Sequence, residues 1–387
     1  MNKRKAYVKN GGIMNTVRII NEKYLDANGD EYVIGGVETY IRNLIELFLD
    51  MNFEVFVYQY ANKAFSIKRD GAKIVAIEKR KSKIKSYNMK RLVKEASKDA
   101  DFENDILIFA TDFSVVKSRF KKVLTIQHGI AWDIQKTENV KDITNRLSII
   151  KGAIRANYKY TRFKKCQYIV CVDYNFMNWY KTQVLHINSQ MRVIPNFADA
   201  PSNYIKKPDS NVVSIVFARR LVEYRGTRIF VNAIKPLLKK YNNLYICIAG
   251  TGPEEKWMKE QLKSFSNVVF SQYSAKESIN FHTKFDIAVV PTRGSEGTSL
   301  SLLEAMSAGC AVVATQVGGM TNIILNNYNG YLVEPNFEDV MEAIEKLIKD
   351  KEHRNVMAKR GYDTVISSFS LSQWKEKWKK LILEIIG

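Results

Sequence analysis

Short apolar runs alternate along the chain with longer segments in which apolar residues recur at helical spacing. The helical pattern is clearest at 33–48. Strands that alternate with helices predict α/β domains with mostly parallel sheets. The apolar runs predict a first series of strands at 16–20, 54–58, 73–77, 106–110, 123–127, 168–172 and 192–195, and a second at 212–217, 245–249, 268–270, 285–290, 310–315 and 331–333.

A polar segment at 196–210 separates the two series of strands, and 387 residues are enough for two domains. We therefore expect Rossmann-like domains at 1–200 and 201–369, followed by a C-terminal helix at 370–387. No window holds 18 consecutive apolar residues, and the basic N-terminus lacks the apolar stretch of a secretory signal. The four cysteines show no zinc spacing, which favours a reducing, cytoplasmic setting.

The net charge of +20 is unevenly distributed. Residues 1–200 contain 35 basic and 21 acidic side chains, a net charge of +14, with basic runs at 79–98 and 151–165. Such runs attract nucleic acid or anionic lipid, although each one alone is equally typical of a solvated helix face. Apolar residues interleave the first run (Ile84, Tyr87, Met89 and Leu92), which favours a membrane surface.

Two carboxylates stand out in the stretch 285–319. Glu296 lies in a Pro/Gly loop, 291–297, that follows a predicted buried strand, and Glu304 lies in the predicted helix 299–308, which Gly309 ends. In open parallel sheets, ligands bind at the carboxyl ends of the strands. A carboxylate in that loop is poorly explained by packing, and it indicates recognition of hydroxyl groups.

The spacing of Glu296 and Glu304, inside P-x4-E-G-x4-L-L-E-A-M-x-A-G, resembles the E-x7-E motif of the retaining glycosyltransferases of family 4. The resemblance covers roughly 15–385. It implies a GT-B fold, in which an N-terminal acceptor domain and a C-terminal nucleotide-sugar domain face a cleft and the last helix crosses back. It also implies that Glu296 binds donor-sugar hydroxyls and that Glu304 binds the ribose.

The same block implies further donor contacts at the start of the helix. They come from the backbone at Gly297, Thr298, Ser299 and Leu300, where N–H groups can meet sugar or phosphate oxygens. The family usually has an aromatic residue and then glycine at 298 and 299, so the identity of the donor sugar stays open. Ser299 could instead be an N-cap.

Phosphate binding is implied by FARRLVEYRG at 217–226, which resembles G-R-L-x-x-x-K-G. The match assigns the donor diphosphate to Arg220 and Arg225, since guanidinium binds phosphate oxygens bidentately. Arg219 replaces the usual small residue of the family, and Arg225 replaces lysine.

Other positions match the family less specifically. Gly35, Gly36 and Glu38 match a GG-x-E element whose backbone approaches the diphosphate, although a tight turn would also explain the glycines. His128 corresponds to a residue that contacts the donor sugar or its phosphate, and a structural histidine is the alternative. The remaining assignments are a backbone role for Gly250 and contacts with the base around Gln272 and Tyr273.

We expect no metal ion and no cofactor besides the donor. The Asp99–Asp101 pair (DAD) precedes a predicted strand instead of following one, unlike a metal-binding D-x-D. The segment that starts at Asp26 resembles a calcium loop, but position 12 would be Val37 where an acid is required. Arg220 and Arg225 would neutralise the charge of the diphosphate, which a divalent ion does in other enzymes.

The expected activity is retaining transfer of a sugar from a UDP-, GDP- or dTDP-linked donor to a hydroxyl of a glycan, lipid-linked at the inner face of the plasma membrane. The protein would be cytoplasmic and peripherally bound there, with no nucleic acid as a partner. A GT-B-fold nucleotide-sugar epimerase and a non-enzymatic polyanion-binding protein are the alternatives. The second would leave Glu296 and Glu304 without a purpose.

Overall fold

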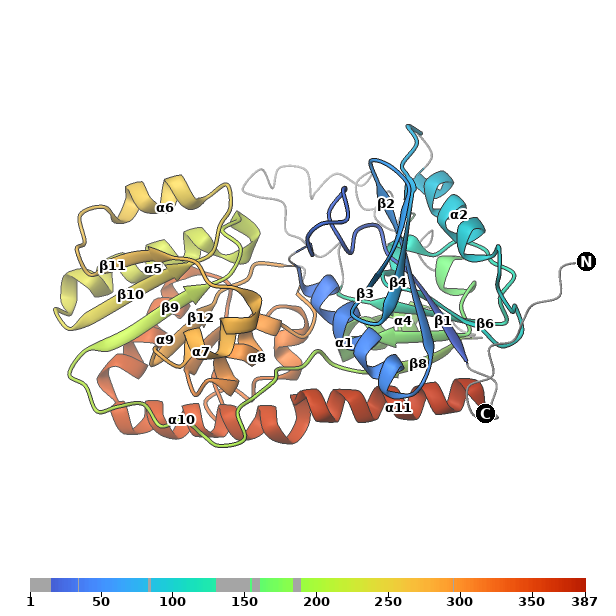
Figure 1. Ribbon diagram of the computed structural model, residues 1–387. Coiled ribbons are helices and arrows are strands. Elements are labelled where there is room, and N and C mark those ends of the chain that lie inside the picture. Colours follow the sequence, from blue (N-terminus) through green and yellow to red (C-terminus); the bar gives the residue numbers. More distant parts are fainter. Residues whose placement is uncertain are drawn as a thin grey trace, which may run out of the picture.

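The computed structural model describes residues 15–33, 35–82, 85–129, 154, 161–183, 189–294 and 296–387, which form two α/β halves side by side (Figure 1). Each half is built around one sheet, and both sheets are almost entirely parallel. The two halves therefore have the architecture that the alternation of strands and helices predicts.

The N-terminal sheet has the strand order β3-β4-β2-β1-β5-β6-β7-β8, and β3 is its one antiparallel strand among the described residues. We did not predict β3. It is joined to β4 by the two-residue turn Asp70–Gly71, in which both residues have positive φ, the conformation of a tight hairpin. The strands are β1 (Thr16–Ile20), β2 (Glu54–Ala61), β3 (Phe65–Arg69), β4 (Ala72–Glu78), β5 (Ile106–Phe109), β6 (Lys122–Gln127), β7 (Tyr168–Cys171) and β8 (Gln190–Val193).

The C-terminal sheet has the order β11-β10-β9-β12-β13-β14, and all its pairings are parallel. The strand order reverses between β9 and β12, and in such sheets ligands bind beyond the carboxyl ends at this switch point. The loops after β9 and β12 carry the two motifs to which the resemblance assigns phosphate and hydroxyl binding. The strands are β9 (Val213–Ala218), β10 (Leu244–Ala249), β11 (Val268–Ser271), β12 (Ile287–Val290), β13 (Ala311–Thr315) and β14 (Tyr331–Val333).

Amphipathic helices cover the sheets. In the first helix the buried residues Tyr40, Ile41, Leu44, Ile45 and Phe48 recur at helical spacing and pack against β1 and β2 residues. The helices are α1 (Gly36–Asp50), α2 (Lys85–Ala96), α4 (Tyr174–Gln183), α5 (Thr227–Lys240), α6 (Glu255–Leu262), α7 (Ser278–His282), α8 (Leu300–Ser307), α9 (Phe337–Lys349), α10 (Lys351–Thr364) and α11 (Leu371–Ile386). In the described part of the chain, no helix is long and apolar enough to cross a membrane.

The C-terminal helix α11 crosses back to the N-terminal half, as the resemblance implies. It continues the line of α10 along one side of both halves (Figure 1). Trp374 and Trp378 are buried against α1, and Trp378 Nε1 donates to the hydroxyl of Tyr40 at 2.8 Å. The crossing segment lies beside the connection after β8, because the N–H of Ala198 donates to the carbonyl of Phe369 at 2.9 Å.

Candidate active site

The loop that follows β12 places Glu296 at the switch point of the C-terminal sheet. The Glu296 side chain is only 9% exposed, and its Oε2 accepts hydrogen bonds from Thr292 Oγ1 at 3.0 Å, from Arg219 Nη2 at 3.0 Å and from Arg225 Nη1. Burial alone raises the pKa of this carboxyl, but Arg219 and Arg225 outweigh burial, so the pKa lies below its usual value. Glu296 is therefore a buried, ionised carboxylate.

Of the two arginines beside Glu296, only Arg225 is one that the motif indicates. Arg219 and Arg225 converge on Glu296, whereas Arg220 is exposed and influences the carboxyl of Glu38. We had noted residue 219 only as a departure from the family pattern. Arg219 and its neighbour Thr292, which are hydrogen-bonded to each other, are the site residues that sequence reasoning missed.

The N-terminal half supplies the opposite wall. Gly36, the first residue of α1, lies beside Leu300, because a Cβ atom added to Gly36 would be 3.3 Å from Leu300 Cδ1. Gly35 precedes it in extended conformation, and an added Cβ would collide with the carboxylate of Glu38. The predicted glycine pair and the predicted helix start thus face each other.

His128, at the end of β6, lies against the loop that holds Glu296. The carbonyl of His128 is so close to Gly297 that a Cβ atom at Gly297 would lie 2.9 Å from it. The ring Nε2 bonds to the carbonyl of Ala110 at 2.9 Å, and the ring meets Tyr40 edge-on. Burial lowers the pKa of His128 to about 4, so the imidazole is neutral at physiological pH, with Nε2–H as donor and Nδ1 as acceptor.

The start of α8 joins the two halves directly. Thr298 Oγ1 donates to the carbonyl of Val172, and Asn196 Nδ2 donates to the carbonyl of Thr298 at 2.6 Å. Ser299 occupies the N-cap position in extended conformation, but its hydroxyl makes no capping bond and lies 3.2 Å from Ser301 Oγ. Ser299 is therefore the N-cap residue of α8, although its side chain makes no capping bond.

Two further glycines, Gly318 and Gly319, shape the loop from behind. Gly318 has a φ of +54°, and a Cβ atom on either residue would collide with the backbone of 296–298. The N–H of Gly319 donates to the carbonyl of Glu296 at 3.0 Å. The Gly-Gly pair after β13 could have indicated this close approach from the sequence.

The second carboxylate, Glu304, has a different environment. Its Oε2 accepts from Ser278 Oγ at 2.7 Å, and no cation pairs with it within the described residues. Burial raises the pKa of Glu304 to about 7, and the bond from Ser278 offsets part of that rise. At neutral pH this carboxyl is divided between its protonated and ionised forms.

Three other predicted residues line this end of the site. Tyr273 stacks on Phe281 with ring centroids 4.5 Å apart, and its phenol is electrostatically coupled to Glu304. Gln272 is exposed. Gly250, with a φ of +136°, lies against the carbonyl of Arg219, where any Cβ atom would collide.

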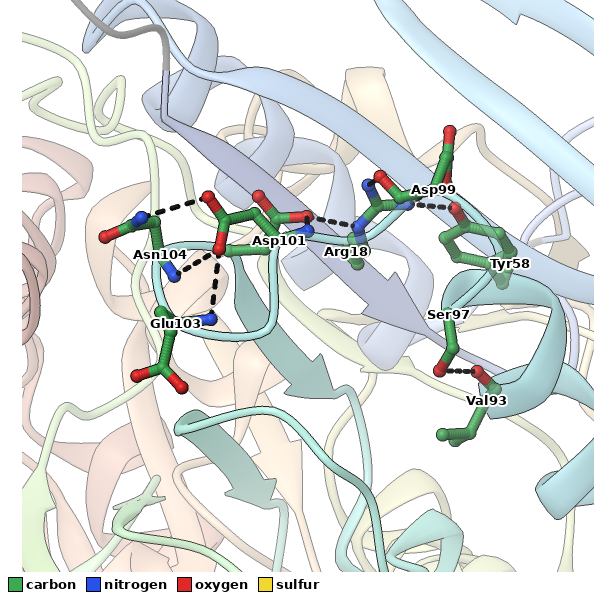
Figure 2. A network of polar contacts seen from close by, with 9 residues as sticks. Arg18, Tyr58, Val93, Ser97, Asp99, Asp101, Glu103 and Asn104 are labelled. Atoms are coloured by element: carbon green, nitrogen blue, oxygen red, sulfur yellow. Dashed lines mark hydrogen bonds and ion pairs between the residues drawn. The ribbon is translucent and has the colours of Figure 1, made fainter. Parts of the chain in front are cut away.

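Neither acidic segment that we rejected as a metal site faces this cleft. Asp99 Oδ1 binds Arg18 Nη1 at 2.8 Å, while Asp101 accepts N–H groups of the turn at 103–104 (Figure 2). Asp26 accepts the N–H groups of residues 28, 29 and 30. Within the described ranges, no three His, Cys, Asp or Glu side chains are grouped as metal ligands.

Comparison with known proteins shows what parts of this chain are similar to. Residues 203–364 match the group 1 glycosyl transferases. An uncharacterised glycosyltransferase of Methanocaldococcus jannaschii is 23% identical over 299 residues, which are 74% of each chain. The capsular polysaccharide biosynthesis glycosyltransferase CapM of Staphylococcus aureus is 29% identical over 180 residues, 45% of this chain and 46% of its own.

A solved structure extends the likeness to both halves. A TarM variant of S. aureus, in complex with fondaparinux, α-GlcNAc-glycerol and UDP, superposes with a TM-score of 0.70 at 14% identity. The superposition covers 97% of this chain and 100% of that one. The fold is GT-B. Together with the family match, it supports a glycosyltransferase with relatives in polysaccharide biosynthesis.

Proposed function

We propose that the protein transfers a sugar from a nucleoside-diphosphate donor to a hydroxyl of a glycan, with retention of the anomeric configuration. The observation that carries the proposal is Glu296. It is a buried, ionised carboxylate at the switch point, paired with two arginines, and Leu300 of the following helix lies beside Gly36 of the opposite domain. A carboxylate accepts two hydroxyl donors in fixed geometry, and the arginines are available to phosphate oxygens.

Each part of the donor would contact a different set of residues. Glu296 would bind sugar hydroxyls, Glu304 the ribose, and Arg220 and Arg225 the diphosphate. Backbone groups at Gly35, Gly36, Gly250 and 297–300 would meet sugar and phosphate oxygens, and the base would lie near Gln272 and Tyr273. His128, neutral and oriented by Ala110, would contact the sugar or the departing phosphate.

Catalysis would consist mainly of positioning and of stabilising the leaving group. Arg220, Arg225 and the N–H of Gly36 would stabilise the departing diphosphate, with no metal ion required. Glu296 is engaged by two arginines and Thr292, so it is suited to accept hydroxyl protons and poorly suited to attack the anomeric carbon. We therefore favour a same-face mechanism in which the leaving phosphate assists the acceptor hydroxyl.

For the acceptor, we propose a glycan, lipid-linked at an anionic membrane surface. CapM, a relative over 45% of this chain, is named for capsular polysaccharide biosynthesis. The charge of the N-terminal half supports the membrane: Lys79, Arg80 and Lys81 are exposed. Part of our sequence argument is wrong, however, because Met89 and Leu92 are buried in the core and only Tyr87 is exposed. Ile84 and most of the basic run 151–165 lie outside the described residues.

The proposal is tested by a panel of UDP-, GDP- and dTDP-sugars. The protein is incubated with each, with and without excess EDTA, and release of the nucleoside diphosphate is measured. Hydrolysis of one donor class that persists in EDTA is the expected result. Loss of turnover in EDTA, restored by magnesium or manganese, would refute metal independence, and no turnover of any donor, with or without a glycan acceptor, would refute the function.

A further inference from the structure

Glu296 has two cationic partners where one would neutralise it. Arg219 Nη2 and Arg225 Nη1 both bind Oε2, so the cluster carries a net charge of +1, and no hydrogen bond to Oε1 is recorded within the described residues. A buried surplus cation is costly unless a further anion neutralises it. The proposed donor brings such an anion, its diphosphate.

The two arginines differ in how firmly they are held. The Arg219 side chain is 5% exposed, and its backbone N–H donates to the carbonyl of Ala249 at 2.9 Å. The Arg225 side chain is 24% exposed and belongs to the 3-10 turn Glu223–Arg225, outside the sheet. Arg219 is therefore the fixed partner, and Arg225 is the one that can move without opening the core.

Arg219 is also bonded to Thr292, and one of its polar atoms has no partner among the described residues. Arg219 donates to Thr292 Oγ1, which in turn donates to Glu296 Oε2 at 3.0 Å, so three side chains form a closed set. Arg219 Nε is buried without an acceptor within the described residues. The hydrogen bonds of Arg219 therefore go to Thr292 and Glu296, which fixes its guanidinium beside the carboxylate.

From this geometry we infer that Arg219 is a positioning residue for donor transfer. It holds the carboxylate of Glu296 in the orientation that binds the sugar, and it thereby releases Arg225 from Glu296 to the diphosphate when the donor binds. The inference rests on the proposed function, and it assigns a role to the residue that departs from the small side chain usual in the resembled family.

Other charged groups near the cluster are already accounted for. Arg293 binds Glu223 at 3.4 Å, the guanidinium of Arg225 lies over the ring of Tyr224, and Tyr273 is coupled to Arg219 electrostatically. The imidazole of His128 is neutral because burial lowers its pKa. Among the described neighbours, Arg219 and Arg225 are thus the charges that keep Glu296 ionised.

Two variants separate the roles. Arg219→Gln should move the acidic limb of the kcat/KM profile for donor hydrolysis upward by about one to three pH units, because Glu296 loses its fixed counter-ion. Its affinity for UDP, or for GDP if the panel selects a guanosine donor, should change less than about threefold. Arg225→Gln should move the limb upward by less than Arg219→Gln does, and it should weaken diphosphate binding at least about tenfold, as loss of a charged hydrogen bond does.

Three controls make the outcome decisive. Lys240→Gln removes an exposed positive charge that is paired with Glu345, outside the cluster. This variant should match the parent in the acidic limb and in diphosphate binding. Arg219→Lys should keep the limb near that of the parent. Thermal melting checks the fold of each variant. If the Arg219 variants do not fold, diphosphate binding by Arg225→Gln still tests the inference, because parent-like binding would overturn it.

Equal losses at every pH in Arg219→Gln would show a merely structural role and overturn the inference. A limb that moves further upward in Arg225→Gln than in Arg219→Gln would overturn it as well, because Arg225 would then be the principal counter-ion of Glu296. Neither outcome affects the proposed function, which fails only if the parent protein turns over no nucleotide sugar.

Discussion

Glu296 and Glu304 are eight residues apart, and the pKa values of their carboxyls are displaced in opposite directions. Two guanidinium groups lower the pKa of Glu296, whereas burial with a single hydroxyl partner raises that of Glu304 to about 7. Environment alone separates two identical side chains in this way. Each shift leads to a different prediction.

Replacing Glu296 with glutamine should preserve the fold and remove most of the transfer activity. The loss of one charged contact that strengthens in the transition state is worth about 2–4 kcal/mol, which corresponds to about 30- to 1000-fold in rate. Turnover of the identified donor measures it. Glu342→Gln, at an exposed carboxylate of α9, is the matched control, and parent-like turnover in Glu296→Gln would exclude the assignment.

Nucleotide binding should release a proton near neutral pH. In the free protein Glu304 is about half protonated at pH 7, and ribose hydroxyls that donate to it would favour the ionised form. Calorimetry of UDP binding in buffers of different ionisation enthalpy should detect a release that grows between pH 8 and pH 6 and vanishes above pH 8.5. The same release in Glu304→Gln would assign the proton to another group.

At the scale of elements, the stability of the N-terminal half depends on α11. Trp378→Ala removes a fully buried ring and its bond to Tyr40, so the free energy of unfolding should fall by about 3–5 kcal/mol in denaturant titration. Leu383→Ala, on the exposed face of the same helix, should change it by less than about 0.5 kcal/mol. Equal effects of the two changes would mean that the helix does not dock through its tryptophans.

The sequence predicted most elements because each has a strong local pattern. Continuous apolar runs located the parallel strands, and the helical spacing at 33–48 located α1, which begins at Gly36. The antiparallel β3 could not be predicted in this way, because its alternating, half-exposed residues form only a weak apolar run. Its Asp70–Gly71 turn was the available indication.

The site was less predictable, because it depends on contacts between distant segments. Motif spacing found Glu296, Glu304 and Arg225, but Arg219 and Arg220 are adjacent and nothing local decides which one points inward. Their direction is set by the pleat of the chain leaving β9 and by the position of Glu296, 77 residues away from Arg219. The same holds for Gly318, whose role is visible only against the backbone of Glu296.

At the scale of the whole molecule, the charge of the N-terminal half predicts binding to anionic membranes. Changing Lys79, Arg80 and Lys81 together to glutamine should release the protein from anionic vesicles, since each basic residue contributes about 1 kcal/mol near such a surface. Co-sedimentation at several salt concentrations measures the binding. The control changes Lys259, Lys263 and Lys346, on the C-terminal half, to glutamine, which removes the same amount of positive charge.

Turnover of a soluble acceptor should be unchanged in the triple variant, because the three residues lie outside the donor site. If the variant co-sediments as fully as the parent, the basic run is a solvated surface and the membrane partner is wrong.

The chain passes between the two halves twice, and the passages are fastened to each other. Ala198 on the first is hydrogen-bonded to Phe369 and Leu371 on the second, at 2.9 and 3.1 Å. Two passages that are bonded to each other restrict relative motion of the halves more than a single passage would. Cutting the chain once within 201–210 would therefore leave both halves attached, because the second passage continues from α10 into α11 and stays bonded to Ala198.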